Sequence, residues 1–209
     1  MSAQPALIEA RNVWKTYGDQ VVLERLDLSI AEGEFCAVVG ASGCGKTTFL
    51  RMLLGEEPPD RGQILFDGAP LHMEPDAGRG IVFQRYSVFP HLTVLGNVLL
   101  GLELRQSPLL GRLFGGARRD ARGKALEMLA QVGLDHAQHR YPSELSGGMQ
   151  QRLALAQSLI VQPRLLLLDE PFGALDPGIR ADMHKLVAAL WREHRLTVLM
   201  ITHDLNLVR

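Results

Sequence analysis

Hydrophobic residues recur along the chain in two rhythms, and the first of them is a strict alternation. Leu26, Leu28 and Ile30 are separated by single polar residues, a pattern typical of a strand with one buried face. Gly18 and Asp19 mark a turn between two such segments. We expect strands over residues 7–17, 21–30, 35–39, 64–66 and 79–84.

The second rhythm places apolar residues three and four positions apart, as on one face of a helix. It predicts helices over 93–105, 121–132, 146–161 and 179–194. Largely apolar runs at 164–168 and 196–201 are typical of strands buried in a parallel sheet. Strands alternating with helices predict a doubly wound α/β core, with a mostly parallel sheet. To this core the pattern adds an N-terminal antiparallel β region and a helical insertion at about 86–143, all within one domain, 1–209.

The stretch 106–122 is rich in Gly and Arg, and we expect a loop between two helices of the insertion. Most of the residues of a basic cluster lie in this stretch, and we favour the interpretation of this cluster as a solvated face over that of a binding patch. The cluster consists of Arg112, Arg118, Arg119, Arg122 and Lys124.

Composition narrows the class of protein. The chain has 209 residues, of which 46% are hydrophobic and 22% charged, with a net charge of −1, so no overall charge points to nucleic acid or an anionic membrane. No apolar stretch approaches the length of a membrane-spanning helix. The two cysteines, Cys36 in a strand expected to be buried and Cys44, make no disulfide framework and fit a reducing cytoplasm.

A glycine-rich segment between the strand at 35–39 and an apolar helix-like run at 49–54 has the pattern of a P-loop. Its glycines allow a tight turn that points backbone N–H groups inward at a helix N-terminus, so the segment can bind phosphates. Lys46 would reach the β- and γ-phosphates and Thr47 a Mg²⁺ ion. The alternative is a glycine-rich turn without a ligand. The residues expected to bind ATP are Gly40, Ala41, Ser42, Gly43, Cys44, Gly45, Lys46, Thr47 and Thr48.

Two acids follow the apolar run at 164–168. Asp169 is suited to hold Mg²⁺, and Glu170, pointing the other way, could take a proton from an attacking water. The alternative is a solvated strand end before Pro171. Tyr17, before the first turn, could present its ring to an adenine or be an ordinary half-buried tyrosine.

Residues 145–152 resemble the signature sequence of the ATP-binding cassette (ABC) ATPases, and the order and spacing of motifs match that family along nearly the whole chain. The signature comprises Leu145, Ser146, Gly147, Gly148, Met149 and Gln150. By this resemblance Tyr17 is the adenine-stacking aromatic and Gln84 the switch glutamine, a catalytic residue that also holds the metal. Asp176 belongs to a dimer-contacting loop, and His203 is the switch histidine that contacts the γ-phosphate.

The resemblance implies that two copies pair head to tail, so that each ATP, with its Mg²⁺, lies between the P-loop of one copy and the signature of the other. It implies hydrolysis coupled to membrane-spanning permease subunits through 84–90, an indirect link to a solute-binding protein, and no nucleic acid. The subunit would lie on the cytoplasmic face of the inner membrane. Segments 141–149 and 169–176 resemble importers of nitrate, sulfonates and taurine, whereas 89–94 resembles cassettes for polar amino acids or polyamines.

Relatives usually continue with further strands and helices after the switch histidine, whereas this sequence stops at Arg209. We therefore expect a truncated domain whose last strand is poorly covered. Three other functions are alternatives to the ATPase subunit of an importer. An ABC ATPase acting on nucleic acid or a ribosome is disfavoured by the single cassette and the lack of a basic stripe. A small-molecule kinase would need an acceptor pocket and lid, and a nucleotide-sensing module would lack the base Glu170.

Overall fold

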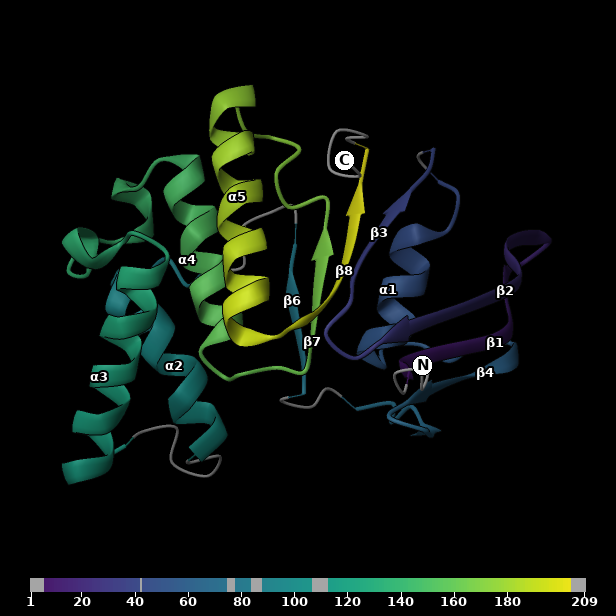
Figure 1. Ribbon diagram of the computed structural model, residues 1–209, viewed down its shortest axis with the longest axis horizontal. Helices are drawn as coiled ribbons and strands as arrows, with labels where there is room; N and C mark the ends of the chain where they lie inside the picture. The colour runs from purple at the N-terminus through teal and green to yellow at the C-terminus, as the bar shows by residue number, and fades with distance from the viewer. Residues whose placement is uncertain (1–5, 42, 75–77, 84–87, 107–112, 204–209) are drawn as a thin grey trace.

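The computed structural model describes residues 6–41, 43–74, 78–83, 88–106 and 113–203. Its first part is an antiparallel sheet with the strand order β2-β1-β4-β5 (Figure 1). The strands are β1 (Ala6–Tyr17), β2 (Gln20–Ala31), β4 (Arg61–Phe66) and β5 (Ala69–Pro70). Gly18 takes a φ of 59° in the expected turn between β1 and β2, a left-handed conformation that suits glycine. The predicted antiparallel β region is confirmed.

A second sheet is parallel and has the order β3-β8-β7-β6. Its strands are β3 (Phe35–Val39), β6 (Arg79–Val82), β7 (Leu165–Asp169) and β8 (Thr197–Thr202). The expectation that the last strand is poorly covered is wrong, because β8 lies between β3 and β7 and is buried at every position. Among the described strands, β3 has a neighbour on one side only. Cys36 on β3 is accordingly half-buried rather than buried, and this partial burial raises the pKa of its thiol.

The two central strands bury side chains on both faces of the parallel sheet. Leu165, Leu167, Leu199 and Ile201 pack with the buried side of α1 (Lys46–Leu54). The intervening residues, Leu166, Leu168, Val198 and Met200, belong to the cluster that includes α4 (Gly147–Leu159) and α5 (Pro177–His194). Since neighbouring strand residues point to opposite faces, α1 lies on one side of the sheet and α4 and α5 on the other (Figure 1). This explains why both strands are apolar runs without alternation.

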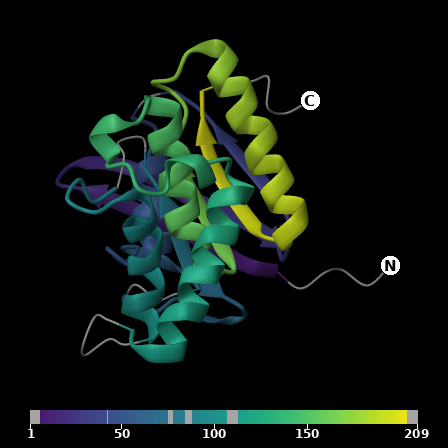
Figure 2. The same cartoon turned by 90° about the vertical axis from the view of Figure 1, so that its left-hand side faces the viewer.

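The helical insertion contains α2 (Val94–Gln106) and α3 (Gly115–Gln131), followed by 3₁₀ turns at Asp135–Ala137 and Pro142–Glu144. These helices pack beside α4, on the side of the molecule away from the antiparallel sheet (Figures 1 and 2). The expected loop to residue 122 is wrong in its second half, because α3 already begins at Gly115. The glycines of this stretch suggested a loop. The buried side chains of Leu113 and Ala121, however, belong to the hydrophobic cluster of the insertion helices and hold the first turns of α3 in place.

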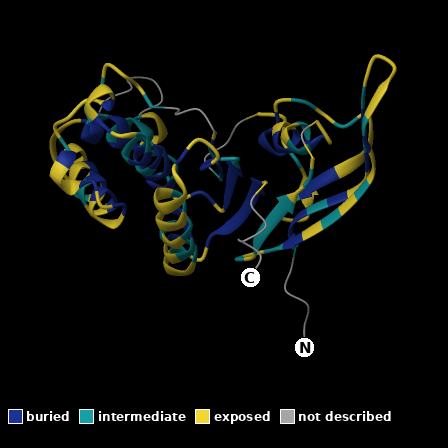
Figure 3. Cartoon of the chain, turned by 90° about the horizontal axis from the view of Figure 1, so that it is seen from above, coloured by how far each residue is buried: buried dark blue, intermediate teal, exposed yellow. Residues whose placement is uncertain are grey.

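Buried residues follow the inward side of the helices and fill the central strands (Figure 3). Four residues of the predicted basic cluster lie on α3 and are exposed, as a solvated face requires, and the fifth, Arg112, lies outside the described residues. The four are Arg118, Arg119, Arg122 and Lys124. Within the described ranges, no helix has the length and apolar character needed to cross a membrane.

Candidate nucleotide site

The predicted P-loop joins the end of β3 to the start of α1. Gly43 and Gly45 have φ values of 81° and 93°, in the left-handed region that glycine adopts without strain. A Cβ on Gly45 would also lie 2.7 Å from Leu23 Cδ2 and 2.8 Å from the Val22 oxygen, so no larger residue fits there. Among the described residues no side chain caps α1, which leaves the N–H groups of its first turn available for phosphate oxygens.

Lys46 lies over this loop. Its ammonium donates to the carbonyl oxygens of Gly40 at 2.8 Å and Ala41 at 2.7 Å and lies 3.7 Å from the Cys44 sulfur. A flexible, partly exposed ammonium held by carbonyls can exchange these partners for phosphate oxygens. The ammonium therefore lies over the loop that would bind the phosphates, and its contact with them stays a prediction.

Thr47 and Asp169 come together from different elements, as predicted for a Mg²⁺ site. The Thr47 hydroxyl lies 3.5 Å from Asp169 Oδ2, a weak contact at the carboxyl end of β7. Burial, and then the neighbouring charge of Glu170, raise the pKa of Asp169, while Thr47, Lys46 and Arg51 oppose this rise. Hard oxygen ligands beside a phosphate site fit Mg²⁺, which usually takes one or two protein oxygens and completes its shell with phosphates and water.

Glu170 is directed toward His203 by an unusual backbone. Its φ is 46°, a left-handed conformation that disfavours most side chains, and its N–H donates to the Ile201 oxygen at 3.0 Å. This places Glu170 Oε1 2.5 Å from His203 Nε2, at the ends of the neighbouring strands β7 and β8. The carboxylate is partly buried, with 26% of its side chain exposed, and the imidazole is about half exposed. The two residues proposed from separate motifs therefore form one close carboxylate–imidazole pair.

The signature segment opens α4, as expected. Ser146 is the N-cap residue, and its hydroxyl accepts a hydrogen bond from the Met149 N–H at 3.4 Å. The Gln150 amide donates to the carbonyl oxygens of Pro142 and Leu145, which holds the turn before the helix. A Cβ on Gly148 would lie 2.7 Å from Ile179 Cγ2 of α5.

Because α4 and α1 lie on opposite faces of the parallel sheet, the structure does not bring the signature to the P-loop of the same chain. Asp176, the predicted dimer-contact residue, is exposed immediately before α5. Two predicted site residues, Ser42 and Gln84, lie outside the described residues.

Tyr17 ends β1 with an exposed ring, and the residue is 46% exposed. Its hydroxyl donates to Glu57 Oε2 at 2.5 Å. This hydrogen bond to a carboxylate is the main cause of a raised Tyr17 pKa, and the Thr48 hydroxyl of α1 opposes it. The structure therefore attaches the proposed adenine-stacking residue to the P-loop helix and to the loop that follows it.

Sequence reasoning missed two buried amides near the predicted motifs. Asn97 is completely buried in α2, accepts from the Phe89 N–H at 2.7 Å, and donates to the oxygens of Phe89, Leu92 and Thr93. Gln151, also completely buried, donates to the Phe83 oxygen at 3.5 Å and so links α4 to the end of β6. Asn97 stands in no motif. Gln151 lies within the signature-like segment 145–152, but nothing local predicts its contact with Phe83, because the partners of both amides are set by how the chain folds back.

Comparison with known proteins agrees with this arrangement of a P-loop, an acidic strand end and a signature helix. The family model described as ABC transporter matches residues 23–173. The chain is 45% identical over 199 residues to the sulfate/thiosulfate import ATP-binding protein CysA of Pseudomonas aeruginosa, covering 94% of this chain and 59% of that protein. It is 44% identical over 199 residues to the aliphatic sulfonates import ATP-binding protein SsuB of Pseudomonas putida, covering 95% and 68%. It is also 44% identical over 201 residues to the spermidine/putrescine import ATP-binding protein PotA of Nitrosomonas eutropha, covering 95% and 53%.

Solved structures give the same result for the fold. The chain resembles cbiO1 from Clostridium perfringens, part of the ABC transporter complex cbiONQ, with a TM-score of 0.85 and 27% identity over 98% of this chain and 81% of that chain. It resembles the ATP-binding cassette MJ0796, in a dimeric post-hydrolysis state bound to ADP and Pi, with a TM-score of 0.80 and 33% identity over 96% of this chain and 89% of that chain.

The fold and site define a P-loop nucleotide-binding protein. The chain belongs to the ABC transporter family. It spans between half and about two thirds of the length of the three import ATP-binding proteins compared above.

Proposed function

We propose that this chain is the ATP-binding and ATP-hydrolysing subunit of an importer for a small solute. The observation that carries the proposal is the convergence of Lys46, the Thr47–Asp169 pair and the Glu170–His203 pair at one end of the parallel sheet. The import ATP-binding proteins to which the chain is similar support the same function.

In this proposal the P-loop amides and Lys46 bind the phosphates, and Thr47 and Asp169 hold Mg²⁺, which neutralises charge on the phosphates. Glu170 takes the proton of the attacking water. His203, 2.5 Å away, holds the carboxylate in place and contacts the γ-phosphate. Gln84 is proposed to complete the metal shell. Tyr17 is proposed to stack on the adenine.

Hydrolysis also requires the signature of a second copy. Ser146 and the N-terminal amides of α4 form a phosphate site, and this site lies on the opposite side of the sheet from α1. A head-to-tail dimer with ATP at each contact satisfies both sites, and Asp176 would lie in the contact between the copies. The dimeric state of the related cassette MJ0796 supports this arrangement.

The remaining partners are proposed from the relatives. Membrane-spanning permease subunits would bind the segment that Asn97 holds, around Phe89, next to the predicted switch glutamine. A solute-binding protein would act indirectly, and the subunit would lie on the cytoplasmic face of the membrane. The relatives named above import sulfate, sulfonates and polyamines, so the proposed solute is a small charged molecule.

Substitution of the proposed base tests this function. Glu170→Gln keeps the size of the side chain but accepts no proton, so ATP hydrolysis should fall by about 10²–10⁴-fold while ATP binding persists. Because ATP would then stay trapped, size-exclusion chromatography should show a dimer in ATP and a monomer in ADP. The matched control is Glu24→Gln, at an exposed position on β2. Normal hydrolysis by the Glu170→Gln protein would remove the assigned base.

A further inference from the structure

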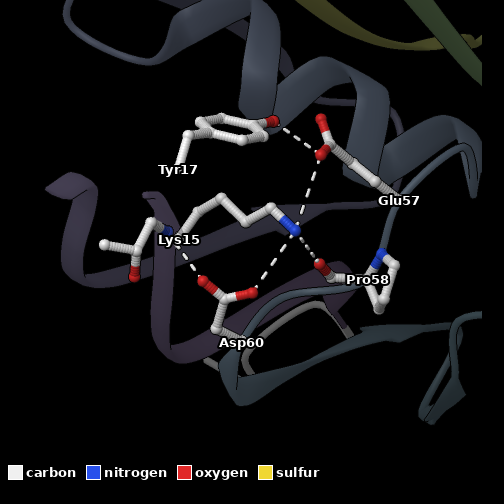
Figure 4. Close-up of polar contacts among 6 residues, drawn as sticks. Lys15, Tyr17, Glu57, Pro58 and Asp60 are labelled. Carbon is white, nitrogen blue, oxygen red and sulfur yellow. Dashed lines mark hydrogen bonds and ion pairs between the residues drawn. The ribbon is translucent and has the colours of Figure 1, made fainter. Parts of the chain in front are cut away.

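Three consecutive residues at the end of β1 are bound to the loop that follows the P-loop helix (Figure 4). The Lys15 ammonium donates to the Pro58 oxygen at 2.8 Å and lies 3.4 Å from Asp60 and 3.5 Å from Glu57. The Thr16 N–H donates to Asp60 Oδ2 at 2.7 Å, and the Tyr17 hydroxyl donates to Glu57 Oε2 at 2.5 Å. This network thus connects the proposed base-binding strand end to the helix that begins at the phosphate site.

The charged groups at the centre of the network are shielded from water. Lys15 and Glu57 expose only 10% and 19% of their side chains, and each compensates the charge of the other. The Thr16 N–H is the main cause of a lowered Asp60 pKa, with Lys15 adding to it, so Asp60 stays ionised. The Lys15 ammonium also lies 5.5 Å from the centre of the Tyr17 ring.

The ring itself is exposed, unlike the groups that hold it. An exposed tyrosine without anchors would exchange between side-chain rotamers, and a ligand that stacks on it would have to stop that motion. A hydrogen bond to a shielded carboxylate, with a cation beside it, fixes the ring before the ligand arrives. The cost of ordering the ring is then met during folding instead of binding.

We propose that Glu57, supported by Lys15, is a positioning residue that holds the Tyr17 ring as a preformed platform for the nucleotide base. This inference rests on the proposed function, since it requires Tyr17 to contact the base. Glu57 acts through the ring: one carboxylate oxygen accepts the Tyr17 hydroxyl, and the other is buried without a hydrogen-bond partner among the described residues. The network affects affinity for the base and leaves the phosphate site on α1 unchanged.

Two ligands separate these contributions. MgATP needs the base platform and the P-loop, whereas magnesium tripolyphosphate has no base and needs only the P-loop. Isothermal titration calorimetry should show that Glu57→Ala and Tyr17→Phe each raise the Kd for MgATP by about tenfold, the scale of one hydrogen bond to a charged group. Each should change the Kd for tripolyphosphate by less than about twofold. The neighbouring exposed Glu56→Ala is the matched control and should change neither.

Three further measurements separate positioning from general support of the fold. Glu57→Gln keeps an oxygen that can accept the Tyr17 hydroxyl, so it should restore most of the ATP affinity. The double variant Tyr17→Phe/Glu57→Ala should bind ATP no more weakly than either single variant, because both remove the same hydrogen bond. Steady-state kinetics should show a raised KM for ATP with kcat retained.

Equal weakening of ATP and tripolyphosphate binding, additive effects in the double variant, or unchanged ATP affinity in Glu57→Ala would each overturn the inference. Failure of the proposed function itself looks different. Wild-type protein would then bind neither ligand, or Lys46→Ala would leave both affinities unchanged. If Tyr17→Ala binds ATP as wild type while Lys46→Ala does not, the nucleotide site stands and the base platform is refuted.

Discussion

Gly148, in the first turn of the signature helix, offers a test that separates packing from phosphate recognition. The substitution Gly148→Ala adds a Cβ that would lie 2.7 Å from Ile179 Cγ2, closer than side-chain carbons approach without movement. Ile179 is 39% exposed, so it can rotate away. The overlap should therefore cost about 2 kcal/mol, within the range of about 1–3 kcal/mol for overpacking.

A second effect has the opposite sign. Alanine in a helix is more favourable than glycine by about 0.8–1.0 kcal/mol. In the wild-type background the two effects should leave a net loss of about 1 kcal/mol, and Tm should fall by about 2–4 °C. In an Ile179→Ala background the overlap is gone, so the same Gly148→Ala change should raise Tm instead.

ATPase activity should not follow this change of sign. The added methyl group lies beside the amides that would meet the γ-phosphate of the second copy's ATP. We expect hydrolysis to fall by about 10²-fold in both backgrounds, the effect of removing one donor from a preorganised anion site. Thermal unfolding and ATP hydrolysis, measured for the four proteins of this cycle, give both results from the same samples.

Two outcomes would refute the reasoning. An equal loss of Tm in both backgrounds would show that the contact with Ile179 is not the cause of destabilisation. Recovery of ATPase activity together with Tm in the double variant would show that Gly148 serves packing and not phosphate recognition. Gly123→Ala is a suitable control, because a Cβ there meets no atom within 4 Å.

Chemical modification or substitution of three other residues gives further testable predictions. Alkylation of exposed Cys44 should abolish nucleotide binding, MgATP should protect against it, and Cys44→Ser should resist it; inactivation of the serine variant at the wild-type rate would place the sensitive thiol elsewhere. Since burial raises the pKa of Asp169, folding disfavours its ionised form, so Asp169→Asn should raise the Tm of nucleotide-free protein at neutral pH and weaken Mg²⁺-dependent ATP binding. The gain in Tm should shrink as pH falls through the raised pKa of Asp169 and be nearly gone at the ordinary aspartate pKa. Asn97→Ala removes four hydrogen bonds and should destabilise the protein by about 2–4 kcal/mol in denaturant titrations, whereas Gln106→Ala, at an exposed position of the same helix, should leave the unfolding midpoint nearly unchanged.

The parts of the fold that could be predicted are those that depend on neighbours in sequence. The apolar run that forms β7 predicts a strand, and the glycines that precede α1 predict a phosphate-binding loop, from the local sequence alone. The place of β8 between β3 and β7, which covers both of its edges, could not be predicted, because strand order depends on how distant segments of the chain fold together. The start of α3 was missed for a similar reason: glycines favour a loop, and distant packing overrides them.

In the candidate site, too, residues in local motifs could be predicted, whereas residues that depend on distant contacts could not. Lys46, Thr47, Asp169 and Glu170 were found because each stands in a short motif with a physical role. Glu57 was not, because its partner Tyr17 lies on another element and only the folded chain brings them together. Residues that hold other residues in place carry a weaker local signal than residues that meet a ligand.

The left-handed backbone of Glu170 sets activity and stability against each other at a single position. A residue with a side chain is strained there by about 1 kcal/mol or more, whereas glycine would adopt the same φ of 46° without strain. A library selected only for thermal resistance should therefore enrich glycine at this position and yield hardier proteins that no longer hydrolyse ATP. Under the proposed role of Glu170 as the base, residue 170 would have to be excluded from the mutable set when this cassette is stabilised.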